Sequence, residues 1–181
     1  MAISKLRSES IDLTDDYAFT GTITGAGGGK VLQVVSTEKT DQFTTTSTSF
    51  VDVTGMSATI TPSSTSSKIL VFFTVGLVGN NTGGQFCYAK LVRDSTDISI
   101  GDTAGSRLRT GTGGGGDQTY DNGPLTIHVL DSPSTTSATT YKIQFKAQTG
   151  GTAKFNSRGD DADSAGYGRT SASLTVMEIE G

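Results

Sequence analysis

The stretch that decides the fold is Tyr141–Ala147, YKIQFKA. Apolar side chains occupy every second position, and charged or amide side chains stand between them. This period of two predicts a β-strand with one face in a core and the other in water. Similar runs recur along most of the chain, between turns of Gly, Ser, Thr and Asn, without a comparable helical period. We therefore expect an all-β protein.

Candidate strands follow one another from Lys30 onward. They cover residues 31–36, 50–53, 56–61, 68–79, 85–93, 125–130, 139–148, 152–155 and 171–179. About eight to ten short strands with close turn signals are typical of an antiparallel β-sandwich or jelly roll. The polar run 80–84 between two of these strands is expected to be a hairpin-like connection.

The segment 68–79, KILVFFTVGLVG, breaks the alternation because it is almost entirely apolar. Such a strand is expected to be buried on both faces. One face would meet the opposite sheet, and a second copy of the chain would cover the other. We therefore expect Leu70, Phe72, Val75 and Leu77 to form a core strand and subunit interface, and the chain to be a homotrimer.

Composition excludes several classes of protein. Among 181 residues, 33% are hydrophobic, 18% are charged, 24 are glycine, and the net charge is −4. This balance fits exposed sheets and offers no cluster of basic residues for nucleic acid. Without an apolar run of about 18 residues, no membrane insertion is expected. Residues 1–7 lack the apolar region of a signal peptide, so synthesis in a cytoplasm is expected.

Residues 1–29 differ from the remainder and are expected to form an extended N-terminal segment before a β-sandwich head at 30–181. Ile3, Leu6, Leu13 and Tyr17 fall at heptad-like spacing and are our candidates for attachment to a larger particle. The glycine-rich run 25–29 is expected to be a flexible joint.

Two polar, glycine-rich stretches, 101–116 and 156–168, are expected to be exposed loops, which often carry function. The run 111–116 matches a dinucleotide-binding fingerprint by letters, but no helix follows it, so a flexible loop is expected. The candidate ligand contacts on and near such loops are Tyr120, Asp121, Asn122, Arg158, Asp160 and Tyr167.

Two motifs in the second loop allow other interpretations. Residues 158–160 spell the Arg-Gly-Asp tripeptide that some adhesion receptors bind, although a tripeptide also arises by chance. Asp160, Asp161 and Asp163 could approach a calcium ion, but they lack the spacing of an EF-hand, so a solvated acidic loop is expected.

No catalytic constellation is visible. The chain has one histidine, His128, and one cysteine, Cys87, each within a strand pattern and without a supporting motif. We expect a protein that is not an enzyme and that uses neither a cofactor nor a metal.

Two regions resemble known families. Residues 13–25, LTDDYAFTGTITG, look like the threonine- and glycine-rich stem repeats of tailed-bacteriophage fibre proteins. Residues 50–56, 67–71 and 172–179 resemble the appendage tips of such phages, especially marine ones. The strand order is also similar to the trimeric jelly roll of the complement C1q and tumour-necrosis-factor group, although a collagen-like stalk is missing.

These resemblances imply a virion structural protein, made in the host cytoplasm. As a trimeric tail fibre or fibre tip, it would bind a host glycan or protein by non-covalent contacts, and it would bind other virion proteins through residues 1–29. A capsid decoration protein, a free C1q-like adhesion or lectin module, and a polysaccharide-degrading tip remain as alternatives. No catalytic residues carry over from these families.

Overall fold

The computed structural model describes residues 30–115 and 123–181, and within these ranges it contains eleven β-strands and no helix. The strands are β1 Val31–Lys39, β2 Phe43–Thr45, β3 Val51–Ile60, β4 Lys68–Asn80, β5 Phe86–Arg93, β6 Thr96–Ile98, β7 Thr112–Gly115, β8 Gly123–Asp131, β9 Thr139–Ala147, β10 Ala153–Phe155 and β11 Ala172–Ile179.

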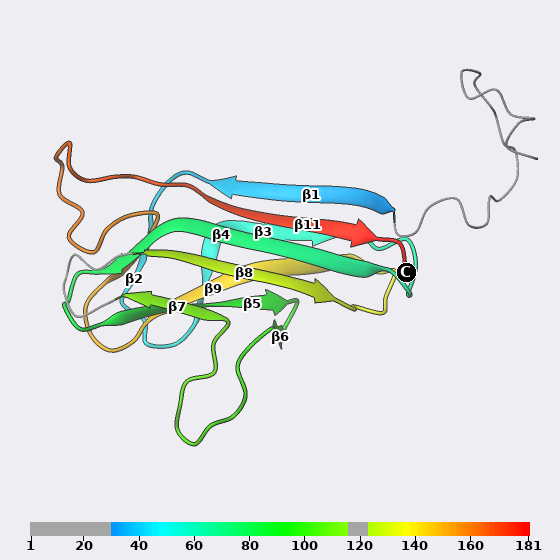
Figure 1. Cartoon of the computed structure of the whole chain (residues 1–181), viewed down its shortest axis with the longest axis horizontal. Helices are drawn as coiled ribbons and strands as arrows, with labels where there is room; N and C mark the ends of the chain where they lie inside the picture. The colour runs from blue at the N-terminus through cyan, green and yellow to red at the C-terminus, as the bar shows by residue number, and fades with distance from the viewer. Residues whose placement is uncertain (1–29, 116–122) are drawn as a thin grey trace, which may run out of the picture.

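The strands form two antiparallel sheets that pack face to face as a sandwich (Figure 1). In the first sheet the order is β1-β11-β4-β8, and β10 followed by β2 continues the β11 side of β4 at Val78–Asn80. In the second sheet the order is β3-β9-β5, and β5 pairs with both β6 and β7. Successive strands β3, β4 and β5 alternate between the sheets, as in a jelly roll, so the all-β prediction is confirmed.

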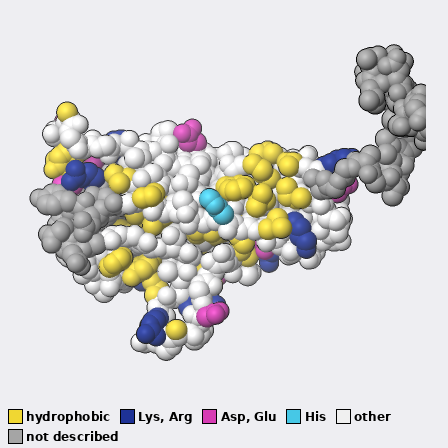
Figure 2. All heavy atoms as spheres, in the orientation of Figure 1, with side chains coloured by type: hydrophobic (Ala, Val, Ile, Leu, Met, Phe, Trp, Pro, Cys, Tyr) yellow, Lys and Arg dark blue, Asp and Glu magenta, His cyan; other side chains and the backbone are white. Residues whose placement is uncertain are grey.

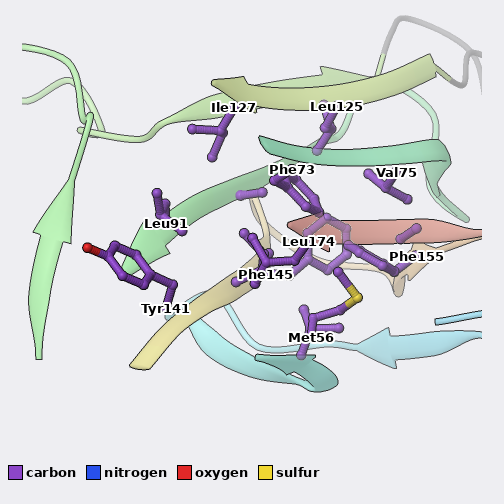
Figure 3. Packing of buried hydrophobic residues seen from close by; sticks show 14 of the residues in the cluster. Met56, Phe73, Val75, Leu91, Leu125, Ile127, Tyr141, Phe145, Phe155 and Leu174 are labelled. Carbon is purple, nitrogen blue, oxygen red and sulfur yellow. The ribbon is translucent and has the colours of Figure 1, made fainter. Parts of the chain in front are cut away.

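The core lies between the two sheets and is built from alternate residues of each strand. In β9, Tyr141, Ile143 and Phe145 are fully buried, as the period-two pattern predicts. Phe155 joins the two sheets: its ring stacks on Phe73 at 6.2 Å and meets the edge of Phe145 at 5.5 Å (Figure 3). Burial of such apolar side chains is the main force that stabilises a sandwich.

Two buried polar clusters close one end of the sandwich, on either side of Ile69. In one, Asp131 of β8 accepts hydrogen bonds from Arg93 of β5 at 2.7 Å and from the Tyr141 hydroxyl of β9 at 2.6 Å. This cluster links the two sheets directly. Burial, together with the Asp131 carboxylate, raises the pKa of Tyr141, so its hydroxyl stays protonated and donates.

The second cluster surrounds Glu178 of β11, which is fully buried. Gln33 donates to its Oε2 at 2.6 Å, and the backbone and hydroxyl of Ser63 both donate to its Oε1 at 2.7 Å. Burial raises the pKa of Glu178, but these hydrogen bonds outweigh it and hold the pKa at about 2. The carboxylate thus ties β1 and the β3–β4 loop to the C-terminal strand.

Three sequence expectations differ from the structure. The expected strands 50–53 and 56–61 form one strand, β3 Val51–Ile60, because Gly55 takes a φ of 85° and lets the strand continue past a bulge. The run 80–84 is not a hairpin, since β4 and β5 lie in opposite sheets. The run 111–116 is not simply a flexible loop: β7 occupies Thr112–Gly115 and pairs with β5.

The glycine strand forms because bare backbone can approach its neighbours closely. A Cβ added at Gly114 would lie 2.9 Å from Leu125 Cδ2, and one at Gly111 would lie 2.8 Å from Ile127 Cδ1. Side chains at these positions would push β7 away from β8. Glycine in a sequence usually indicates a break in a strand, but in β7 the glycines permit close packing instead.

Candidate interaction surfaces

The outer face of the first sheet carries an apolar surface that none of the described residues covers. The strand register places Val34, Met177, Leu70 and Leu130 side by side in one row across β1, β11, β4 and β8. A neighbouring row in the same strands contains Ser36, Thr175, Phe72 and His128. Neither row holds an aspartate, a glutamate, a lysine or an arginine.

These side chains are accessible in the single chain. Leu130 is 56% exposed, Val34 54% and Phe72 36%, and Figure 2 shows hydrophobic side chains gathered beside the histidine on this face. The patch continues along β1, where Val31 and Leu32 are also exposed. A contiguous apolar patch on a β-sheet typically marks an interface. We call this set of residues, from β1, β11, β4 and β8, the apolar face.

His128 lies within the apolar face, opposite Phe72 of β4. Its ring meets that of Phe72 at 5.0 Å in an edge-on arrangement. The imidazole therefore extends the apolar surface with an aromatic contact, and it stands in a row of hydroxyl and apolar side chains.

Within one chain, β4 is buried on its inner face only, so a cover for its outer face by a second subunit stays a prediction. Of the four residues proposed for the interface, Leu70 and Phe72 lie on the outer face. Val75 is fully buried in the core, and Leu77 is half-buried beside an irregularity in the register with β8.

The sequence analysis missed Val34, Leu130 and Met177 as partners of Leu70. The sequence does contain a sign of these partners, since β1, β8 and β11 each carry apolar residues that point to both faces of the sheet near one end of the strand. The register that aligns these positions comes from pairing between distant segments, which a single sequence does not reveal.

The loop after β10 brings together three of the six predicted ligand contacts. The Arg158 guanidinium lies 4.4 Å from the centre of the Tyr167 ring, and its Nε is 3.2 Å from Asp160 Oδ1. Desolvation raises the pKa of Asp160, but a hydrogen bond with Tyr167 and the charge of Arg158 outweigh it, so the net pKa is lowered. These three side chains stabilise one another.

Asp161 is the hub of the same loop. Its Oδ2 accepts from Gln42 at 2.9 Å and from Arg169 at 3.1 Å, and Lys154 Nζ lies 4.0 Å away. An open pocket of about 230 Å³ borders it, lined by Asp161, Ala162, Asp163, Ser164, Tyr167 and Arg169. The pocket is polar and shallow, and the charged groups around Asp161 largely neutralise one another.

This geometry bears on the two motifs of the loop. Arg158 and Asp160 bond to each other and Gly159 is buried, so the tripeptide does not present two free charges to an adhesion receptor. In the described ranges, no three His, Cys, Asp or Glu side chains are grouped so that they could hold a metal ion. Nor does the described part of the chain include a helix able to span a membrane.

Seven of the predicted residues lie outside the described ranges. These are the attachment residues Ile3, Leu6, Leu13 and Tyr17, and the ligand candidates Tyr120, Asp121 and Asn122.

A scan against models of protein families finds no match to this chain, and a search of curated proteins finds none. Among solved structures, the chain is similar to one from the structure of infectious bursal disease virus, Gx strain. The match covers 91% of this chain and 45% of that chain, at 12% identity and a TM-score of 0.39. This chain thus spans less than half the length of the viral one, and no functional argument follows from similarity at this level.

Proposed function

We propose that the protein is a homotrimeric virion structural component whose subunits pack through the apolar face. The observation that carries this proposal is the row Val34–Met177–Leu70–Leu130, in which Val34 and Leu130 are exposed and Leu70 and Met177 are half-buried in the single chain. Burying a large aliphatic side chain contributes about 1.5–3 kcal/mol, so three copies of such a row provide a strong driving force. The threefold symmetry is supported by the resemblance to the C1q and tumour-necrosis-factor group.

The trimer would serve as a tail fibre or fibre tip that attaches the particle to its host. Support comes from the stem-like sequence at 13–25 and the tip-like segments at 50–56, 67–71 and 172–179. Residues 1–29 would bind other virion proteins, and the head would bind a host glycan or protein by non-covalent contacts. Three copies of a head turn a weak contact into an avid one.

Competition against infection tests attachment. The purified full chain, added to host cells before the phage, is expected to reduce adsorption in proportion to its concentration. Antibodies against the head are expected to label fibres in electron micrographs of the particle. Labelling of the capsid lattice without competition would overturn the attachment role and favour the decoration role instead.

A further inference from the structure

The glycine strand β7 supports a pair of aromatic rings on the outer face of the second sheet. Tyr88 lies opposite Gly113 in the register, and Phe86 lies opposite Gly115. A Cβ added at Gly113 would lie 2.7 Å from Tyr88 Cδ1, so the Tyr88 ring packs directly over bare backbone. The absence of a side chain at Gly113 is therefore what lets the ring lie close to the sheet.

The two rings stack with nearly parallel planes, and we call this pair the platform. Their centroids are 6.3 Å apart and their planes differ by 17°, while Phe86 is 38% exposed and Tyr88 is half-buried. The rings thus present nearly parallel faces beside an edge of the sheet. The Tyr88 hydroxyl makes no hydrogen bond to any residue in the described ranges, so it can still donate or accept.

A lysine that forms no ion pair with any described residue lies next to the platform. Lys146 of β9 pairs with Tyr88 in the register, and its Nζ lies 5.7 Å from the centre of the Phe50 ring. Lys90 lies over the same ring at 4.8 Å, but Asp97 neutralises it at 2.7 Å. Among the described residues, no ion pair is formed by Lys146, so its charge is available to an anion.

We propose that this surface, Phe86, Tyr88 and Lys146, binds a saccharide that carries a carboxylate group. The apolar C–H face of a sugar ring would stack on the two aromatic rings, as aromatic faces favour flat apolar partners. The Tyr88 hydroxyl would bond a sugar hydroxyl, and Lys146 would pair with the acidic group. Because Lys146 forms no ion pair among the described residues, we expect this surface to bind an acidic saccharide more tightly than a neutral one.

This inference rests on the proposed host attachment, for which it specifies a site and a ligand class. The apolar face and the platform lie on opposite outer surfaces of the sandwich, so trimer assembly would leave the platform open. Binding of an oligosaccharide to one head also does not require a trimer. The two proposals can therefore fail separately.

The test uses NMR titration of the full chain with two acidic probes, tetragalacturonate and sialyllactose. Neutral counterparts, the methyl ester of tetragalacturonate and lactose, are titrated in parallel. We expect at least one acidic probe to shift the signals of the Tyr88 and Phe86 rings, and to bind about fivefold or more tightly than its neutral counterpart. If neither acidic probe shifts these ring signals, the proposal is overturned, whatever the oligomeric state.

Three variants assign the binding to these residues. Tyr88→Ala is expected to weaken the acidic probe about tenfold. Lys146→Gln is expected to abolish the preference for the acid over its neutral counterpart and to keep the ring shifts. Gly113→Ala is expected to weaken binding by displacing the Tyr88 ring, with the fold retained by circular dichroism.

The control is Lys68→Gln, which removes the same charge from the first sheet, where Lys68 donates to Ser132. It is expected to leave both binding and preference unchanged. An equal loss of preference in Lys68→Gln and Lys146→Gln would mean that only the overall charge matters, and would overturn the assignment.

Discussion

The two outer faces of the sandwich differ in composition although they come from the same fold. On the first sheet, the apolar face aligns Val34, Met177, Leu70 and Leu130 with no ionised partner. On the second sheet, the row Asp52–Gln144–Lys90 and the neighbouring Lys142 are polar. Asp52 accepts hydrogen bonds from Lys142 at 2.8 Å and from Gln144 at 2.7 Å, and Lys90 pairs with Asp97.

This difference shows which face is suited to water. A polar face with internal ion pairs keeps its groups hydrated and mutually neutralised, whereas an apolar face gains free energy only when another surface covers it. Both sheets bury their inner faces equally well, so the core does not explain the contrast. The proposed subunit contact on the first sheet, with an outward surface on the second, would account for the contrast.

The largest expected effect comes from placing charge on the apolar face. In Val34→Glu combined with Leu130→Glu, both side chains remain exposed in the single chain, so the fold is expected to be kept. In the assembly the carboxylates would be buried without partners, at a cost of about 4 kcal/mol or about a thousandfold in dissociation constant. Sedimentation velocity is expected to show monomers.

The matched control places the same two charges on the other sheet. Ser57→Glu with Thr59→Glu alters exposed positions on the outer face of β3. This variant is expected to sediment as the unmodified protein does. If both double variants dissociate equally, the added net charge would be the cause of dissociation, and the apolar face would have no special role in assembly.

A smaller effect is expected at the polar cluster that joins the two sheets. Asp131→Asn weakens the hydrogen bonds from Arg93 and Tyr141 and should lower the free energy of unfolding by roughly 2–3 kcal/mol in urea titrations. Asp52→Asn makes the same change at an exposed site and should cost well under half as much. Equal losses would show that the cluster does not hold the sheets together.

Glu178→Gln is expected to cost about 1–3 kcal/mol, because one oxygen is replaced by a donor that faces the Gln33 amide. The pKa of Glu178 is held at about 2, below its ordinary 4.5. Its stabilising contribution is therefore complete above pH 4.5 and is lost as the pH falls toward about 2.

Urea titrations at neutral pH and at a pH between about 2 and 4.5 check this effect. The unmodified protein should lose more stability on acidification than the Glu178→Gln variant. The neighbouring, exposed Glu180→Gln serves as the control and should behave as the unmodified protein. An identical acid response in all three proteins would refute the role given to Glu178.

The smallest effect is expected on the polar face. Lys142→Gln removes an ion pair whose Asp52 partner is 55% exposed, and should change the free energy of unfolding by less than about 1 kcal/mol. A thermal melt of this variant, with and without added salt, checks the effect. A loss as large as that of Asp131→Asn would mean that the polar face contributes to folding as strongly as the core.

The sequence predicted much of the fold because side-chain alternation is a local property. In β9 the buried positions Tyr141, Ile143 and Phe145 follow directly from the pattern. The glycine strand β7 could not be predicted in this way, since its packing depends on Leu125 and Ile127, which follow later in the chain. The cover on the outer face of β4 stays a prediction, because the apolar residues of a strand do not tell which neighbour covers them.

The candidate surfaces were predicted only in part, for a similar reason. Arg158, Asp160 and Tyr167 lie within ten residues of one another, so their association in a loop could be expected. The platform of Phe86, Tyr88 and Lys146 depends on the pairing of β5 with β7 and β9. No spacing in the sequence encodes that register.

The most direct test of the account is the mass of the unmodified full chain in solution, measured by light scattering over a range of concentrations. The account predicts three times the mass of one chain, because the apolar face requires a cover. A mass of one chain at all concentrations would contradict it, and would show that the apolar face stays in water or awaits a different partner.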